Sequence, residues 1–196
     1  MSQELEIEFK NMLTKKEFEQ IKSHYQFSAG EFFTQKNHYF DTPSFSLKEK
    51  GAALRIREKQ GRHVLTLKEP APVGLTETHQ QLSFKPDPES FQIPDGPVSD
   101  RLKGLGVAPG SLAYFGTLAT DRAEKKLPQG LIVLDRSRYL TVEDYELEFE
   151  VADYEKGKHD FKALLQSFGI PERHTKNKIV RFYEQKRERI NKVEKQ

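Results

Sequence analysis

Residues 4–10 decide the fold; they read ELEIEFK and alternate polar with apolar side chains without a break. This alternation is typical of a β-strand with one face in an apolar environment. Side chains two positions apart on a strand point the same way, about 7 Å apart, so the three glutamates and Lys10 share one face. Three carboxylates in a row repel one another, and a bound cation would relieve the repulsion. The alternative is a solvated strand face, and the other strands have to decide between the two.

Length and composition predict one globular domain with a small hydrophobic core. The chain has 196 residues, and we expect a single domain over residues 1–190 followed by a charged tail at 191–196. The hydrophobic fraction of 35% is low and the charged fraction of 32% is high, while 14 phenylalanines argue against disorder. A formal net charge of +2 gives no general attraction to nucleic acids or membranes, so neither is expected as a partner. The oligomeric state stays open.

Several function classes are disfavoured by what the sequence lacks. It contains no cysteine, which excludes disulfides, thiolate metal sites and a cysteine nucleophile. It has no GxxxxGK phosphate loop, and its six histidines show no HxH or HExxH spacing, so we interpret the histidines as surface or turn residues. No apolar run at the N-terminus resembles a signal peptide and no stretch approaches membrane-spanning length, so we expect a cytoplasmic location.

The later strands sort their charged side chains by sign, whereas surface strands usually mix them. In residues 53–59 the basic side chains share one face and Leu54 and Ile56 the other. In residues 145–151 three glutamates lie opposite large apolar residues in the same way. The charged positions on the polar faces of these and the intervening strands are Arg55, Arg57, Lys59, Lys68, Glu77, Arg122, Glu124, Lys126, Asp135, Glu146, Glu148 and Glu150.

Amphipathic helices are predicted at residues 14–25, 161–168 and 179–190, the first opened by a Thr14–Glu17 capping box. About eight strands with helices at the ends and in one long connection indicate an α+β fold, and eight strands suit a closed antiparallel barrel. Two architectures remain open. Either the apolar faces form a core with the charges in water, or the charges line a barrel lumen and the helices cover an apolar exterior. A charged lumen is costly unless it is paired, hydrated or bound to a ligand, here a polyanion that needs both arginines and metal ions.

These motifs, in this order, resemble those of CYTH-domain proteins, the triphosphate tunnel metalloenzymes. Residues 6–10, EIEFK, match the ExExK motif of that family. The further matches, in family order, are LRIR at 54–57, TLK at 66–68, Arg122, Asp135, ELEFE at 146–150 and KNK at 176–178. The ordered set is more specific than ExExK alone, spans Glu4 to about Arg181, and looks most like the small stand-alone bacterial members from Gram-positive rods. It implies one CYTH-type domain over residues 1–190, with an eight-stranded antiparallel β-barrel tunnel whose charged lumen binds a triphosphate and divalent metal.

The resemblance also implies roles for individual residues. Phosphate oxygens would be bound by Lys10, Arg55, Arg57, Lys68, Arg122 and Lys178, with Lys176 as the alternative to Lys178. Mg²⁺ or Mn²⁺ would be held by Glu6, Glu8, Asp135, Glu148 and either Glu146 or Glu150. Guanidinium forks and ammonium groups suit phosphate, and hard carboxylate oxygens suit these ions. Our mechanistic hypothesis beside the resemblance is that one metal bridges the phosphates, and that a second metal or a catalytic glutamate, Glu8 or Glu148, activates the attacking water.

The implied activity is metal-dependent hydrolysis of the terminal phosphate of inorganic tripolyphosphate, thiamine triphosphate or a nucleoside triphosphate. The motifs match the triphosphate moiety, so they leave open what is attached to it. One alternative is a class IV-type adenylate cyclase that forms cAMP from ATP. Another is a non-catalytic module that binds polyphosphate or a nucleotide, and a third is RNA or protein binding through the basic C-terminal helix.

Overall fold

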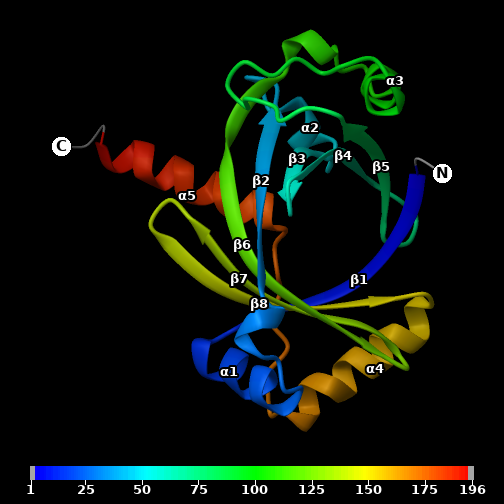
Figure 1. Ribbon diagram of the computed structural model, residues 1–196, viewed down its shortest axis with the longest axis vertical. Coiled ribbons are helices and arrows are strands. Elements are labelled where there is room, and N and C mark those ends of the chain that lie inside the picture. The colour runs from blue at the N-terminus through cyan, green and yellow to red at the C-terminus, as the bar shows by residue number, and fades with distance from the viewer. Residues whose placement is uncertain (1–2, 194–196) are drawn as a thin grey trace. The chain divides into compact units, whose positions relative to one another are not determined.

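A computed structural model describes residues 3–193, with side chains described up to residue 189, and contains a closed barrel of eight antiparallel strands (Figure 1). The order around the barrel is β1-β5-β4-β3-β2-β6-β7-β8. The predicted α+β fold with a closed antiparallel barrel is therefore confirmed. The strands are β1 (Gln3–Leu13), β2 (Phe33–Asp41), β3 (Ala53–Lys59), β4 (Arg62–Pro70), β5 (Leu75–Leu82), β6 (Ala113–Leu127), β7 (Gly130–Tyr139) and β8 (Val142–Val151). The helices are α1 (Lys15–His24), α2 (Ser46–Glu49), α3 (Pro97–Gly104), α4 (Tyr154–Ser167) and α5 (Lys178–Val193), with 3-10 turns at η1 (Ala29–Glu31) and η2 (Pro109–Ser111).

The chain divides into two compact units, and β1 contributes to both. The first unit comprises Met1–Ile7 and Gln35–Thr117, and the second comprises Glu8–Thr34 and Leu118–Gln196. Of the predicted tail at 191–196, residues 191–193 continue α5, and residues 194–196 lie outside the described part of the chain. A single domain over residues 1–190 stays a prediction.

In the first unit, β3 and β4 pack their apolar face under α2 and α3. Leu54 pairs with Leu67 and Ile56 with Leu65 across the two strands, and all four side chains are fully buried in one hydrophobic cluster. The alternate residues point to the opposite face, where Arg55 pairs with Thr66. The predicted sorting of apolar and charged faces is thus confirmed for these strands.

In the second unit, α1 and α4 cover one face of β7 and β8 (Figure 1). The Phe18 ring of α1 lies 4.9 Å from Tyr145, and Phe161 of α4 stacks on Phe149 at 6.2 Å. Thr14 caps α1 through the predicted box with Glu17. Helices can only pack against a closed barrel from outside, so the opposite face of β7 and β8, which carries Asp135 and the glutamates, is the interior one.

One helix is longer than the sequence-based expectation. The helix predicted at 161–168 begins at Tyr154, because the Asp153 side chain caps it by accepting a hydrogen bond from the Lys156 backbone N–H. The segment Pro109–Ser111 forms only a 3-10 turn, and β6 begins at Ala113. The one-turn helix α2 was not predicted; it is too short to show a helical period.

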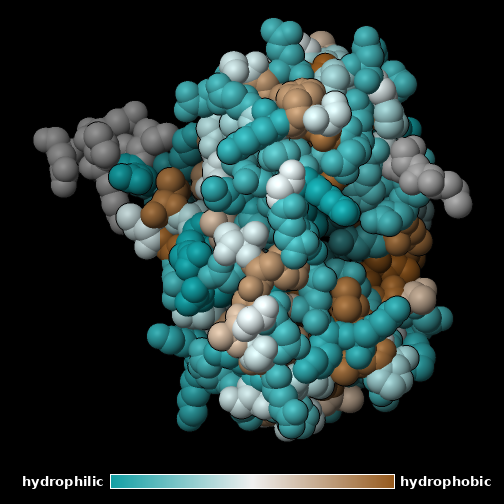
Figure 2. All heavy atoms as spheres, in the orientation of Figure 1, coloured by the Kyte–Doolittle hydropathy of each residue, from teal (hydrophilic) through white to brown (hydrophobic). Residues whose placement is uncertain are grey.

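None of the described helices is long and apolar enough to cross a membrane. The face of the molecule drawn in Figure 2 is coloured mainly as hydrophilic, with hydrophobic residues in scattered groups. This agrees with a chain in which 32% of the residues are charged.

Gly157 allows α4 to lie close to the end of β8. A Cβ atom at this position would stand 2.4 Å from Cγ2 of Val151 and 3.0 Å from the Phe9 ring. We expect Gly157→Ala to destabilise the protein, because overpacking of about 1–3 kcal/mol outweighs the roughly 1 kcal/mol that alanine gains in a helix. Urea unfolding measures the change. Gly104→Ala in α3 is the matched control, since its Cβ meets no atom within 4 Å; equal effects of the two variants would contradict the packing argument.

Candidate functional site

The interior face of β6, β7 and β8 carries a buried cluster of alternating charges. The Arg122 guanidinium donates to both Asp135 oxygens, at 2.8 and 2.6 Å, and to Glu148 at 2.6 Å. The Lys178 ammonium, from the first turn of α5, lies 2.8 Å from Asp135, 2.8 Å from Glu146 and 2.5 Å from Glu148. Asp135 is 0% exposed and Glu146 1%. These residues stand on three neighbouring strands because Arg122 pairs with Asp135, and Asp135 with Glu146, in the strand register.

A second cation from α5 extends the cluster. Arg181 lies 2.5 Å from Glu146 and 3.1 Å from Asp144, and Asp144 accepts a hydrogen bond of 2.8 Å from the Tyr139 hydroxyl. Sequence reasoning missed Arg181 and Asp144. A signal was available, since Lys178 and Arg181 stand three residues apart and therefore on the same side of a helix.

Burial and the neighbouring charges set the protonation of this cluster. Burial raises the pKa of Glu146 to about 7, and the nearby Glu148 carboxylate adds to the rise although Lys178 opposes it. Burial works in the same direction on Glu148, but Arg122 and Lys178 outweigh it and hold its pKa well below the usual range. Burial also disfavours the charged form of Lys178, yet the three carboxylates around it raise its pKa well above the ordinary value. Of the two glutamates, Glu146 therefore has the higher pKa.

Glu8 and Lys10 of β1 belong to the same unit and join α5 through Asn177. The Lys10 ammonium donates to Glu8 at 2.7 Å and to the Asn177 side chain at 2.6 Å. Asn177 directly precedes Lys178, so the start of α5 supplies partners to β1 as well as to β7 and β8. Asn177 was not predicted; a lone asparagine before a helix has the ordinary interpretation of a cap.

The first unit carries its own mixed cluster. The Lys68 ammonium donates to Glu6 at 2.5 Å and contacts the buried Glu77 carboxylate, which Arg55 approaches to 3.8 Å. Burial alone would raise the pKa of Glu77, but Arg55 and Lys68 outweigh it and lower the pKa to about 2. Arg57 donates to the Asn37 side chain at 3.1 Å. Glu77 is therefore the carboxylate that connects Arg55 and Lys68, two of the predicted phosphate ligands, in this cluster.

The interpretation of the histidines as surface or turn residues is wrong for His63, which is 7% exposed and lies within β4. His79 keeps a partly exposed side chain but takes part in a charged cluster. It lies on β5 with Nε2 2.9 Å from Glu4 and 3.3 Å from Glu77, while Nδ1 lies 2.9 Å from the Thr66 hydroxyl. Within the described residues, Glu4, Glu77 and His79 form the cluster in which three metal-ligating side chains approach one another within 4.8 Å. Sequence spacing could not find it, because Glu4 is 75 residues away from His79.

Two alternatives remained open in the sequence, one on the last strand and one at the start of α5. β8 carries three glutamates on one face. On this strand, the Lys178 ammonium forms ion pairs with Glu146 and Glu148. Glu150 lies at the far end of the strand, opposite Leu131. Lys176 is half-exposed and pairs with Glu184 on α5 itself. The geometry thus favours Lys178 over Lys176, and Glu146 with Glu148 over Glu150.

The segment that presents Lys178 is anchored to α1 by a bidentate ion pair. Arg173 donates two hydrogen bonds of 2.9 Å to Glu17. The Arg173 bonds lower the pKa of Glu17 below its ordinary value of 4.5. A lowered folded-state pKa stabilises the protein above pH 4.5, and this contribution is lost as the pH falls through the lowered value.

We therefore expect the free energy of unfolding to fall less on acidification in Glu17→Gln than in the wild type. The expected difference is about 0.5 kcal/mol after solvent screening. Thermal unfolding between pH 7 and pH 3, compared with the wild type, measures the difference. Glu19→Gln on the same helix is the control, because Glu19 is half-exposed and its Lys22 partner is 3.4 Å away. If the pH dependence of stability were the same in Glu17→Gln and the wild type, the ion pair with Arg173 would not contribute to stability.

The protein is thus a closed antiparallel barrel in which the described strands carry buried carboxylates paired with arginines and lysines on their interior faces. The family model of the CYTH domain matches residues 4–183. The chain therefore belongs to the CYTH family.

Two relatives with substantial sequence identity support this assignment. A Bacillus subtilis (strain 168) protein named "Putative triphosphatase YjbK" is 62% identical over 190 residues, which is 97% of this chain and 100% of that protein. A solved structure from Bacillus halodurans, described as "a putative adenylate cyclase", is 42% identical with a TM-score of 0.88, covering 93% of this chain and 100% of that one. A Hippeastrum protein, HpAC1, shares the fold at 23% identity and a TM-score of 0.75, over 92% of this chain and 96% of that one.

Proposed function

We propose that the protein is a metal-dependent triphosphatase that hydrolyses the terminal phosphate of a triphosphate. The observation that carries this proposal is the balanced, buried cluster of the second unit, in which Asp135, Glu146 and Glu148 face Arg122, Lys178 and Arg181. Such a cluster gains little stability over an apolar core, because desolvation consumes most of the attraction between the charges. It is therefore better explained by a ligand that needs both signs of charge. The name of the Bacillus subtilis relative agrees with this activity.

When a metal–triphosphate complex binds, the basic side chains would bind the phosphate groups and the carboxylates would bind the metal, in place of one another. The basic residues that now contact carboxylates would turn to phosphate oxygens; these are Lys10, Arg55, Lys68, Arg122 and Lys178. Arg57, which donates to Asn37, would do the same. The carboxylates released in this way would be the metal ligands. The proposed set is Glu6, Glu8, Asp135, Glu146 and Glu148, with Glu150 as the weaker candidate.

The residues present fit Mg²⁺ or Mn²⁺. The donors are carboxylate oxygens, which these ions prefer, and the chain offers no thiolate for a softer ion. Oε2 of Glu146 is buried and contacts Arg181 without the geometry of a hydrogen bond, so it retains capacity for a ligand. When bound, such an ion would neutralise the charge on the phosphate oxygens.

The chain's own glutamates would handle the attacking water. We assign this role to Glu8 or Glu148, each of which would orient the water and accept its proton. Glu148 is a weak base while Arg122 and Lys178 lower its pKa. Its basicity would rise once those cations bind phosphate, so the ligand itself would help to activate the base.

Phosphate release tests this proposal. Inorganic tripolyphosphate, thiamine triphosphate, ATP and GTP are each incubated with the protein and Mg²⁺ or Mn²⁺, and orthophosphate is measured. We expect release from at least one substrate, dependent on metal and strongly reduced in Glu6→Gln and Arg57→Ala. Arg62→Ala, at the exposed start of β4, is the control. Unchanged rates in the first two variants would contradict the proposed site.

The second candidate is adenylate cyclase, which the description of the Bacillus halodurans relative favours. The two activities differ in their products from ATP. A cyclase yields cAMP and pyrophosphate, whereas a triphosphatase yields ADP and orthophosphate. Saturable, metal-assisted binding of all four substrates without any product would instead indicate a binding module.

A further inference from the structure

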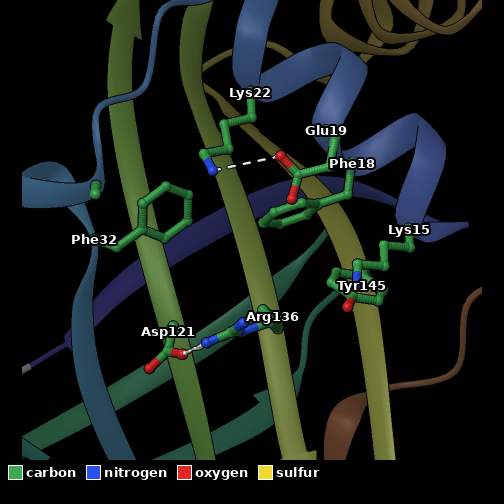
Figure 3. Close-up of a pocket in the computed structure, with 9 residues that line it drawn as sticks. Lys15, Phe18, Glu19, Lys22, Phe32, Asp121, Arg136 and Tyr145 are labelled. Carbon is green, nitrogen blue, oxygen red and sulfur yellow. Dashed lines mark hydrogen bonds and ion pairs between the residues drawn. The ribbon is translucent and has the colours of Figure 1, made fainter.

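A pocket of about 250 Å³ lies on the outer face of β6, β7 and β8, under α1 (Figure 3). Its residues all belong to the second unit. The proposed triphosphate site uses the opposite face of the same strands. The pocket is therefore separate from the function proposed above, and no residue of the proposed site lines it.

Aromatic rings form the apolar part of this pocket. The Phe18 ring lies 4.9 Å from Tyr145 at an angle of 54°, and 6.1 Å from Phe32 at 44° (Figure 3). Tilted rings at these distances present edges and faces to a third ring, which is a favourable arrangement for aromatic contacts. An apolar cavity of about 150 Å³ holds benzene, so this pocket has room for a ring and a substituent.

Charged groups surround the rings, with an excess of positive charge. Lys22 pairs with Glu19 at 3.4 Å, and Arg136 pairs with Asp121 at 2.7 Å (Figure 3). Within residues 3–189, Lys15 makes no hydrogen bond or ion pair. Three cations and two carboxylates thus line the pocket, and Asp121 has a further cation partner in Arg138. The substituent that fits this charge pattern is an anion.

The pocket and the buried charge cluster lie on opposite faces of the same three strands. Asp121, Arg136 and Tyr145 pair in one row across β6, β7 and β8. The adjacent row, one residue along each strand, is Arg122, Asp135 and Glu146. Successive residues of a strand point to opposite faces, so a ligand in the pocket would touch the strands at the same level as the cluster.

We propose that this pocket binds a small aromatic molecule that carries one anionic group. The ring lies against Phe18, Phe32 and Tyr145, and the anionic group lies between Lys15 and Arg136. An aromatic carboxylate and an aromatic phosphate monoester share this chemistry, and the experiment separates them.

Titrations of the full-length protein with phenylacetate and with phenyl phosphate, followed by amide shifts in ¹H–¹⁵N NMR spectra, test the site. We expect saturable binding at about 1 mM or tighter, with shifts in α1 and in the facing segments of β6, β7 and β8. Tighter binding of one probe assigns the pocket to that class of anion. Benzyl alcohol, which lacks the charge, and inorganic phosphate, which lacks the ring, are expected to bind at least about tenfold more weakly.

Matched variants locate the anion. Lys15→Ala and Arg136→Gln should each weaken binding about tenfold. Arg136→Gln leaves Asp121 its bonds to Thr34 and Arg138, so the fold should be retained. Lys16→Ala, at an exposed position of the same helix, is the control. Shifts centred on other residues, no saturation with either probe, or equal losses in Lys15→Ala and Lys16→Ala would overturn the proposal.

Discussion

Replacement of Glu148 by glutamine is expected to reduce triphosphate hydrolysis by about 100-fold or more. Glu148 contacts both Arg122 and Lys178, so its charge connects the proposed metal ligands to the proposed phosphate ligands. Glutamine keeps the shape of the side chain but supplies neither the charge nor the basicity that the reaction needs. The measurement is kcat for phosphate release at saturating metal and substrate.

The control for this variant lies on the same strand. Glu143→Gln removes an identical charge from β8, but Glu143 alternates with Glu146 and Glu148 and accepts a hydrogen bond from Tyr145 on the outer face. It should leave kcat within about twofold of the wild type. Comparable losses in both variants, or full activity in Glu148→Gln, would exclude the interior face of β8 as the reaction site.

Replacement of Arg122 by methionine is expected to lower the free energy of unfolding by about 3–5 kcal/mol. The guanidinium is buried and holds Asp135 and Glu148 through three hydrogen bonds. Without it, Asp135 and Glu148 keep only the ammonium of Lys178, which also contacts Glu146. Urea unfolding at pH 7 gives the size of the effect.

The pH dependence of this loss separates charge from packing. Arg122 lowers the folded-state pKa of Glu148, so its contribution is fully present above the ordinary value of 4.5 and is lost as the pH falls through the lowered one. The difference between wild type and Arg122→Met should therefore shrink in acid. Arg138→Met is the control, because its ion pair with Asp121 is half-exposed and contributes less than about 1 kcal/mol. A difference that stays constant with pH would attribute the loss to packing alone.

Local alternation predicted which side chains share a strand face, whereas the choice of the tunnel and the roles of the site residues came from the resemblance to the CYTH family. Each strand has a period of two, so the apolar neighbours Leu54 and Ile56 determine which way Arg55 and Arg57 point. The same argument places Asp135 and Glu148 on one face of β7 and β8. The capping box at Thr14 was equally local and is confirmed.

The missing parts of the site depend on contacts between segments far apart in the sequence. His79 meets Glu4 only because β5 pairs with β1, and its spacing from other ligands carries no motif. Arg181 meets Asp144 because α5 returns to the interior face of β8. The pocket under α1 depends on how a helix seats on three strands, a tertiary property that periodicity does not encode.

The most direct test of the central claim is a ³¹P NMR time course of inorganic tripolyphosphate with the protein and Mg²⁺ or Mn²⁺. We predict that orthophosphate and pyrophosphate accumulate in equal amounts, that chelation of the metal stops the reaction, and that Glu148→Gln slows it. Tripolyphosphate, thiamine triphosphate and nucleoside triphosphates that all stay intact under these conditions, or cleavage that continues unchanged without metal, would contradict the account.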